Sequence, residues 1–436
     1  MIDRYDLPVT AASPTALEAY DHAVHGLLGW DARALALFRA ATEADPGLAL
    51  AHAGAGVCLF LEERFDEARA AVEIARASAA GQTARERGHV EALALLVNGK
   101  SADAERVMRE HLEAYPRDLM VLQRLYFIWF WQGRFPEMLE LTSRLCRHYA
   151  GDSFVPGLHA FALEQAGRCD EAVRVAAGAL RRNERDAWAV HAFAHAVYEM
   201  AAFETGLTRL PAAIHPCQHL GWFKNHLIWH LTLMHLSRGD YERALTLSRT
   251  VFERAPSSIP GDLHDSISLL WRLALCGIDV SDRWKPFTDI ARERLTRPAL
   301  WFHVAHLAMA LAGGGDWAAA ERQVANLRER APKDRSGLIA EVVLPLVEGV
   351  HAFGRGDYRR AGELIEPLRA RFIELGGSRA QRDVFDDTLL EACFRAGEVH
   401  RAQRLLAQRV ARRPDRYWLT RAAPPGRGAS ARLSPG

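Results

Sequence analysis

The sequence predicts an all-α protein, a superhelical solenoid of about eleven helix-turn-helix units. Three observations support this fold. A motif of Gly, an aromatic residue two positions later, Ala three residues further and Pro twelve after that recurs along the chain. The aromatic position returns at intervals of 34 to 41 residues. Alternating runs of β-branched residues, which would indicate strands, are few. A single two-helix unit cannot bury its apolar stripe, so stacked neighbours would form the core.

The repeated motif divides the chain into units in order. Its aromatic position, whatever residue fills it, falls at Asp31, Phe65, Ser101, Phe135, Cys169, Phe203, Tyr241, Asp279, Trp317, Tyr358 and Val399. The most complete copies are GWDARAL ending at Pro46, GKSADAE at Pro116, GDWAAAE at Pro332 and GEVHRAQ at Pro414. Gly would end the first helix in a left-handed conformation, the aromatic residue and Ala would pack one helix on the other, and Pro would close the unit. We therefore expect the solenoid over residues 15–418, after an N-terminal segment at 1–14 and before a disordered tail at 419–436.

Several segments carry more than the general repeat motif. The 34-residue step resembles the tetratricopeptide repeat, a unit of helix, turn and helix. The segments DAWAVHAFAHAVYEM, HLIWHLTLMHLSRGDYERAL, FHVAHLAMA and LGGSRAQRDVF together resemble the tetratricopeptide repeat protein 38 family, found in bacteria and animals, and indicate a bacterial member. The matching positions are His191, His195, Glu199, His226, His230, Asp265, His306, Gln381, Arg382 and Asp383. The resemblance implies the repeat fold and transfers no activity to these residues.

The composition excludes several classes of function. The 55 Lys and Arg side chains nearly balance the 54 Asp and Glu, so no nucleic-acid-binding surface is indicated. The six cysteines show no CxxC spacing, so neither a disulfide framework nor a zinc ribbon is expected. Neither a signal peptide nor an apolar run of membrane-spanning length is visible, which predicts a cytoplasmic protein without a membrane partner. The motifs GxGxxG, GxxxxGKS/T and GxSxG are missing, so nucleotide binding by those routes and a serine nucleophile are unsupported.

Two histidine ladders are the most unusual chemistry in the sequence. His191, His195 and Glu199 recur at every fourth residue, and His226 and His230 repeat that step one unit later. Positions four apart return to nearly the same face of a helix. Counting back from the aromatic markers puts the first ladder on the inner face of the solenoid, whereas the second is rotated from it by roughly 60–100°. Whether the two ladders share one site stays open.

The same count predicts a ligand-binding groove centred on residues 120–310. The ligand contacts would be Phe127, Trp131, Phe161, Trp229, Asp265, Trp271, His306, Arg382 and Asp383. Their aromatic rings would bury a small, partly apolar molecule, and Arg382 would reach an anionic group on it. Simpler interpretations exist: the aromatic residues form core, Asp265 and Asp383 cap helices, and Arg382 pairs with Asp386. Because the repeats continue past residue 358, the C-terminal units could curl over the groove and close it into a pocket.

Three functions fit these residues. The first is an enzyme of isomerase, lyase or hydrolase type acting on a small molecule, with catalytic His191, His195, Glu199, His226 and His230. The second is a site for a divalent transition metal, zinc, iron or manganese, on the same four histidines, which would also serve an enzyme. The third is a non-catalytic scaffold that binds a protein partner through a peptide in the groove. The simplest alternative is a set of hydrogen-bonded core histidines. Several imidazoles and a carboxylate are costly to bury without a use, so the enzyme is narrowly preferred.

Overall fold

The computed structural model describes residues 1–422 apart from residues 150, 255 and 298. These residues are mostly helical, and β-structure within them is limited to two isolated bridges, Ile2 with Pro8 and Asp31 with Leu220. The predicted all-α fold class is therefore confirmed.

In the part of the chain that the structure describes, no helix has both the length and the apolar character needed to cross a membrane.

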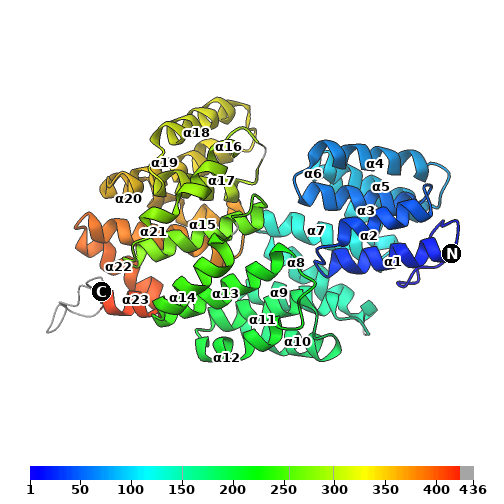
Figure 1. The fold of residues 1–436 in the computed structure, drawn as a ribbon, viewed down its shortest axis with the longest axis horizontal. Helices are drawn as coiled ribbons and strands as arrows, with labels where there is room; N and C mark the ends of the chain where they lie inside the picture. Colours follow the sequence, from blue (N-terminus) through cyan, green and yellow to red (C-terminus); the bar gives the residue numbers. More distant parts are fainter. Residues whose placement is uncertain (150, 255, 298, 423–436) are drawn as a thin grey trace.

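Eleven helical pairs follow one another along the described chain (Figure 1). The first six are α1 (Pro14–Leu28) with α2 (Ala34–Ala44), α3 (Ala49–Leu61) with α4 (Phe65–Ala79), α5 (Ala84–Val97) with α6 (Ser101–Ala114), α7 (Leu119–Trp131) with α8 (Phe135–Leu145), α9 (Phe154–Gln165) with α10 (Cys169–Arg182) and α11 (Ala187–Glu199) with α12 (Phe203–Ile214). The next five are α13 (Trp222–Arg238) with α14 (Tyr241–Leu247), α15 (Pro260–Leu275) with α16 (Lys285–Arg294), α17 (Trp301–Gly313) with α18 (Trp317–Arg330), α19 (Leu344–Gly354) with α20 (Tyr358–Ile365) and α21 (Arg379–Arg395) with α22 (Val399–Arg412). The predicted units are all present.

Shorter helical segments complete the described chain. A last α-helix, α23 (Arg416–Ala422), follows the eleventh pair. Brief 3-10 or π-helical turns extend or connect the longer helices at Cys146–Tyr149, Ser248–Glu253, Ser281–Arg283, Ala331–Lys333, Ile339–Val343 and Glu366–Leu375. The longer spacing of the later repeats is taken up in these turns and in loops between pairs, such as the one from Ile214 to Trp222.

The turn inside each pair explains the repeated motif. In nine units the marker is the first residue of the second helix: Phe65, Ser101, Phe135, Cys169, Phe203, Tyr241, Trp317, Tyr358 and Val399. Eight of the eleven units have a Gly with positive φ two residues before the marker, for example Gly133 at 69°. Glu63 and Ala201 take that position with φ of 59° and 54°, a conformation that only Gly adopts freely. Except in the first unit, where Gly29 has φ −86°, the motif therefore marks the left-handed residue that ends the first helix.

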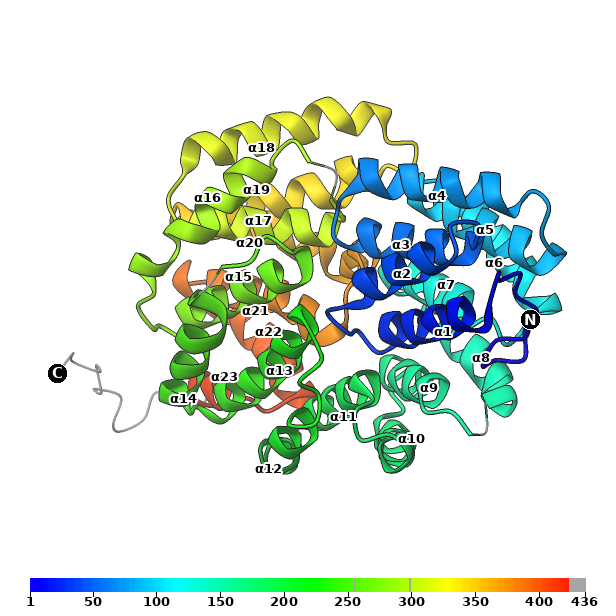
Figure 2. The ribbon, with the colours of Figure 1, turned by 45° about the vertical axis from the view of Figure 1, so that its right-hand side comes forward.

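The solenoid curls until distant repeats touch (Figure 2). α21 packs against α11 and α15, and α23 packs against α13. The turn after α1 reaches the segment before α13, where Ala32 N donates to His219 O at 3.0 Å. Glu63, after the end of α3, pairs with Arg294 at the end of α16. The first two pairs are thus fastened to repeats far along the chain.

Curling fills the inner face with the protein's own side chains. In α11, every residue from Ala187 to Tyr198 is buried. Phe161, Trp229 and Trp271, predicted to line a groove, are 0%, 0% and 4% exposed. Among the described residues, the predicted groove at 120–310 is therefore core rather than an open trough.

Both ends of the described chain pack on the repeats. Thr10 Oγ1 donates to Glu86 Oε2 at 2.8 Å, which holds the N-terminal segment on α5. Residues 419–422 belong to α23, and Trp418 is buried, so helical structure continues past the predicted boundary at 418. The packing of α23 on α13 accounts for this extension. The rest of the predicted disordered tail lies outside the described residues.

Candidate functional site

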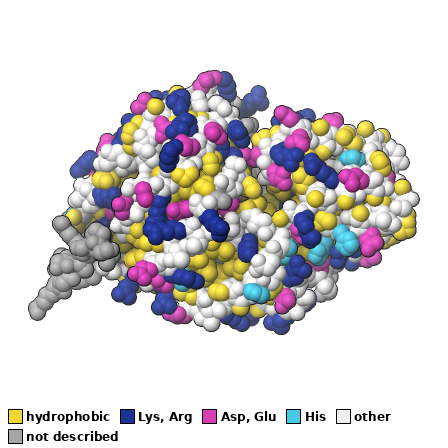
Figure 3. Space-filling view, viewed as in Figure 1, with side chains coloured by type: hydrophobic (Ala, Val, Ile, Leu, Met, Phe, Trp, Pro, Cys, Tyr) yellow, Lys and Arg dark blue, Asp and Glu magenta, His cyan; other side chains and the backbone are white. Residues whose placement is uncertain are grey.

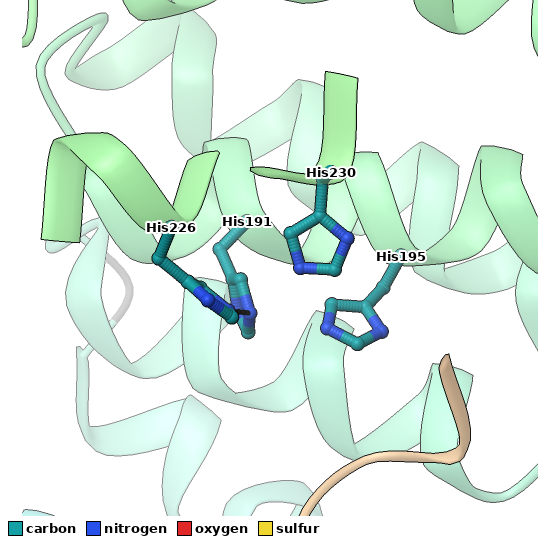
Figure 4. Close-up of side chains that lie close together, drawn as sticks. All are labelled: His191, His195, His226 and His230. Carbon is teal, nitrogen blue, oxygen red and sulfur yellow. Dashed lines mark hydrogen bonds between the residues drawn. The ribbon is translucent and has the colours of Figure 1, made fainter. Parts of the chain in front are cut away.

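Four histidines from two neighbouring helices meet in the interior. His191 and His195 lie on α11, and His226 and His230 lie on α13 (Figure 4). Neighbouring rings have centroids 4.2–5.2 Å apart. Each histidine has one ring nitrogen that lies within 4.8 Å of a ring nitrogen of each of the other three. These four residues are called the histidine quartet, and in it the two ladders share one place.

Local sequence positions the two helices. The carboxylate of Asp186 caps α11 by accepting from Trp188 N and Ala189 N at 3.0 and 2.9 Å. Gly239, with φ 79°, ends α13 in the left-handed conformation. The four-residue step then puts each histidine pair on one helix face. Packing of α11 on α13 brings the two faces together.

Most ring nitrogens of the quartet have no hydrogen-bond partner among the described residues. His191 Nε2 and His226 Nε2 lie 3.0 Å apart, and His226 Nδ1 donates to Asp265 Oδ2 at 2.6 Å. Five nitrogens are buried without a partner: His191 Nδ1 and both ring nitrogens of His195 and His230. Buried polar atoms are nearly always bonded, so five such atoms in one place are not explained by core packing.

Burial sets the charge of the quartet. It lowers the pKa of His191, His195 and His230 well below the usual value, and neighbouring imidazoles lower it further. Burial acts most strongly and would raise the pKa of Asp265, but the imidazoles of His226 and His264 together outweigh it and hold that pKa below its usual value. At neutral pH the three histidines are uncharged and Asp265 is ionised. Neutral imidazole is the form that binds a metal ion.

Aromatic side chains enclose the quartet. Phe161 lies 4.9 Å from His191 and 5.0 Å from His195, and Trp229 stacks on His226 at 5.5 Å between ring centroids. No quartet histidine in the described structure is more than 6% exposed. Three small cavities are lined by other residues; the one between α13, α15 and α23 measures about 40 Å³. A small molecule could reach the quartet only if helices moved.

Glu164, rather than Glu199, is the glutamate beside the quartet. Glu164 of α9 places Oε2 3.7 Å from His195 Nδ1, and burial raises its pKa to about 8. Glu199, predicted to be the partner of these imidazoles, is the last residue of α11 and turns to cations from the eleventh repeat. Its Oε1 lies 3.3 Å from Arg413 Nη1, and its Oε2 lies 4.0 Å from Arg379 Nη1. The ladder spacing was correct, but arginines distant in sequence draw this carboxylate away.

The predicted ligand contacts divide into several groups. Phe161, Trp229 and Asp265 touch the quartet. His306 belongs to a neighbouring cluster instead, with ring centroids 4.4 Å from Phe302 and 5.5 Å from His264. Trp131 packs on the same Phe302 at 6.0 Å. The fifth histidine expected in the shared site thus lies in a second cluster.

The remaining predicted contacts have structural partners. Trp271 Nε1 donates to Thr388 Oγ1 at 2.8 Å, and Phe127 packs against Trp30 and Trp188. Asp383 pairs with Arg412 and Arg413. Arg382 lies over the Phe135 ring at 5.6 Å, and Asp386 pairs with Arg369 instead. These four residues do not converge with the quartet on one ligand.

The residues near the site that were not predicted include Glu164, His264 and His303, together with the aromatic rings of Trp188 and Phe223. His264 Nε2 lies 3.2 Å from Asp265 Oδ1, and the His264 and His303 rings stack at 5.0 Å. His264 could have been predicted from the sequence, because it lies 38 residues after His226, which is the spacing between the later markers. Glu164 follows the predicted Phe161 by three residues, which is one helical turn.

A second group of buried histidines lies in the N-terminal half. Asp118, just before α7, lies 2.9 Å from His89 Nδ1, 3.0 Å from His111 Nε2 and 3.0 Å from Arg85 Nη2. We call these four residues the Asp118 cluster. The guanidinium of Arg85 supplies a permanent positive charge there. A metal cation would have to displace these bonds and approach that charge, so the geometry favours a structural ion-pair network.

The fold and the site together define a curled all-α repeat protein with buried imidazoles. No family model matches the chain. One similar solved structure is that of Naa15/Naa10 bound to HypK-THB, with 13% identity and a TM-score of 0.26, covering 94% of this chain and 65% of that one. The TPR domain of P58(IPK) is 15% identical with a TM-score of 0.20, covering 77% of this chain and 97% of that domain. This chain therefore spans 65% of the length of the first structure. Likenesses this distant carry no argument about function.

Proposed function

We propose that this protein binds one divalent transition-metal ion at the histidine quartet. The observation that carries the proposal is the group of five buried ring nitrogens without partners, on imidazoles that burial keeps neutral. One ion would supply a partner for several of them at once. A closed structural metal site usually has four ligands, and the quartet offers four imidazoles.

The ligand set favours zinc or iron. Imidazole nitrogen suits zinc, iron, copper and nickel, whereas manganese prefers carboxylate and water oxygens. The quartet supplies nitrogen, and its nearest ionised carboxylate, Asp265, is bonded to His226. Manganese, also considered from the sequence, is therefore less favoured.

Elemental analysis of the purified full chain tests the proposal. We expect close to one zinc or iron per chain, or uptake of one ion after reconstitution. His195→Ala combined with His230→Ala should abolish that uptake. His351→Ala removes a buried histidine of α19 and is the matched control. A wild-type chain that stays free of metal through reconstitution, while correctly folded by circular dichroism, would contradict the proposal.

The geometry favours ion binding over conversion of a small molecule by an isomerase, lyase or hydrolase. The quartet is at most 6% exposed, so a substrate would need an opened conformation. The enzyme function preferred from the sequence therefore ranks below a bound ion. Turnover lost in both His195→Ala and a metal-stripped wild type, on a substrate found by metabolite screening, would restore it.

The repeat architecture supports a second function, a scaffold for a protein partner. Since the inner face is filled, such a partner would bind the outer surface, where acidic and basic side chains are interspersed (Figure 3). A defined partner that binds the quartet double variant as tightly as the wild type would establish this function. Cross-links confined to the second helices of the pairs would locate it.

We also propose membership of the tetratricopeptide repeat protein 38 family. The four segments that carry the resemblance contain all four quartet positions on two helices and the first turn of α21. A solved structure of a family member in which the corresponding histidines failed to converge would count against it.

A further inference from the structure

The capping box of α21 determines the orientation of one amide near the quartet. Ser378 N donates to Gln381 Oε1 at 2.9 Å, and Gln381 N donates to Ser378 Oγ at 3.3 Å. Because Oε1 is the acceptor in this box, Nε2 carries the hydrogens on the other side of the amide. That atom lies 3.0 Å from His264 Nε2. Gln381 therefore donates to His264.

The tautomer of His264 follows from its two bonds. Its Nδ1–H donates to Pro260 O at 2.8 Å, and its Nε2 accepts from Gln381. Nε2 also lies 3.2 Å from Asp265 Oδ1, but it cannot donate there while it accepts from the amide. Asp265 Oδ1 is accordingly buried without a donor. Among the residues that the structure describes, His226 is the donor to the Asp265 carboxylate.

The bond to Asp265 in turn determines the tautomer of His226. Since Nδ1–H donates to Asp265 Oδ2 at 2.6 Å, the lone pair of His226 is on Nε2. Nε2 faces the quartet and lies 3.0 Å from His191 Nε2. A ring held in this tautomer presents a lone pair where an ion would bind, with no proton to remove.

We propose that Asp265 is the positioning residue that prepares His226 as a metal ligand and supplies the negative charge that favours a dication. This inference rests on the proposed metal site. Carboxylates that accept from the outer nitrogen of a ligating histidine orient the ring and raise its basicity. Asp265 comes from α15, so the repeat after the quartet completes it.

The test compares two aspartates of the same helix. Asp265→Asn removes the charge and keeps an acceptor, whereas Asp265→Leu removes both. The controls are Asp262→Asn and Asp262→Leu, because Asp262 is also buried, at 7% exposed against 0% for Asp265, and accepts from Asn225 on α13 at 3.1 Å. Zinc affinity is measured by competition with a chromophoric chelator. We expect about tenfold weaker binding for Asp265→Asn and about 100-fold for Asp265→Leu, the range for outer-shell changes.

A second readout separates positioning from mere packing. In the metal-free protein, ¹⁵N chemical shifts of the imidazoles report which ring nitrogen carries the proton. We expect His226 to be protonated on Nδ1 in the wild type and both Asp262 variants, and to lose that preference in Asp265→Leu. Unchanged shifts, with zinc affinity within twofold of the controls, would overturn the role of Asp265 and leave the metal site intact. A wild type that binds no zinc would instead contradict the proposed function.

Discussion

The histidine quartet and the Asp118 cluster are both buried groups of imidazoles, and they differ in what faces the rings. In the Asp118 cluster a carboxylate lies at the centre, within 3.0 Å of two histidines and Arg85. In the quartet imidazoles face imidazoles, and the carboxylate of Asp265 stands outside, on the far nitrogen of His226. Among the described residues, five ring nitrogens of the quartet lack a hydrogen-bond partner. In the Asp118 cluster as described, only one buried histidine nitrogen, His89 Nε2, lacks one.

The difference shows that the number of buried histidines does not define a metal site. An aspartate inside a group of histidines satisfies the rings and, with an arginine, leaves little net attraction for a cation. The same aspartate placed outside leaves inward-facing lone pairs free. The following experiments test this distinction, starting with the largest expected effect.

Metal affinity should depend on the quartet and not on the Asp118 cluster. His195→Ala with His230→Ala removes two of the four proposed ligands and should weaken zinc binding by more than about 100-fold, because losing a residue that only supports a ligand already costs about 10- to 100-fold. His89→Ala with His111→Ala should leave the affinity unchanged. Isothermal titration calorimetry measures both. Comparable losses in the two double variants would remove the distinction between the clusters.

Stability without metal should depend more on the Asp118 cluster. Asp118→Asn removes the nearest carboxylate from buried Arg85, which then keeps Asp3, with Oδ2 at 3.6 Å from Nη2, and the substitution should lower the free energy of unfolding by about 3–5 kcal/mol. Urea denaturation in the presence of a chelator measures the change. The quartet double variant should lose less, since its nitrogens lack partners already.

The effect of Asp118→Asn should also depend on pH. Burial acts to raise the pKa of Asp118, but Arg85 and His89 outweigh it and hold the pKa well below 3.8. A lowered folded-state pKa stabilises the protein fully above the unfolded value and is lost as pH falls through the folded value. The difference from wild type should be constant above about pH 5 and shrink on acidification below it. A difference that grew toward acid pH would contradict this ion pairing.

Added zinc should stabilise the wild type and Asp118→Asn by the same amount. At free zinc 100 times the dissociation constant, the gain is about 2.7 kcal/mol. Thermal unfolding followed by circular dichroism should show this gain in both proteins, and none in the quartet double variant. A gain lost with Asp118 would place the ion in the wrong cluster.

Arg85→Lys should produce the smallest effect, about 1.5 kcal/mol of stability. Both Arg85 Nε and Nη2 lie 3.0 Å from Asp118 Oδ2, and a lysine would keep the charge but lose one of these bonds. Urea denaturation measures the loss, and zinc affinity should be unchanged. A loss as large as that of Asp118→Asn would mean that the geometry of the guanidinium, rather than its charge, holds the cluster.

The fold was largely predictable because the turn and the helix start of each repeat depend on residues within that repeat. In eight units a Gly before the marker reports a left-handed turn, and the marker itself begins a helix at Phe65, Phe135 and Tyr241, among others. These are local requirements, so they appear in local sequence. The convergence of His191 with His226 was accessible for the same reason, since adjacent first helices pack together.

The rest of the site depends on contacts between distant repeats. Glu199 was assigned to the imidazoles by its spacing, but Arg413 reaches it from the other end of the chain. His306 was predicted as a ligand contact in the same groove, whereas α21 brings Phe385 against it at 5.6 Å and makes it part of a second cluster. Periodicity describes neighbouring repeats and contains no information on how far a superhelix curls.

The order of synthesis determines when Glu63 can pair with Arg294, because Glu63 is made before the quartet and Arg294 after it. A ribosome delivers α11 and α13 before α15, α21 and α23, so the four imidazoles can meet while they are still open to solvent. Asp265 and then Arg294 are synthesised later, and Arg294 pairs with Glu63 of the second repeat, which is already complete. If an ion binds at this stage, the later repeats would enclose it, and its exchange from the finished protein would depend on how fast the packing of α15 and α23 on α13 opens.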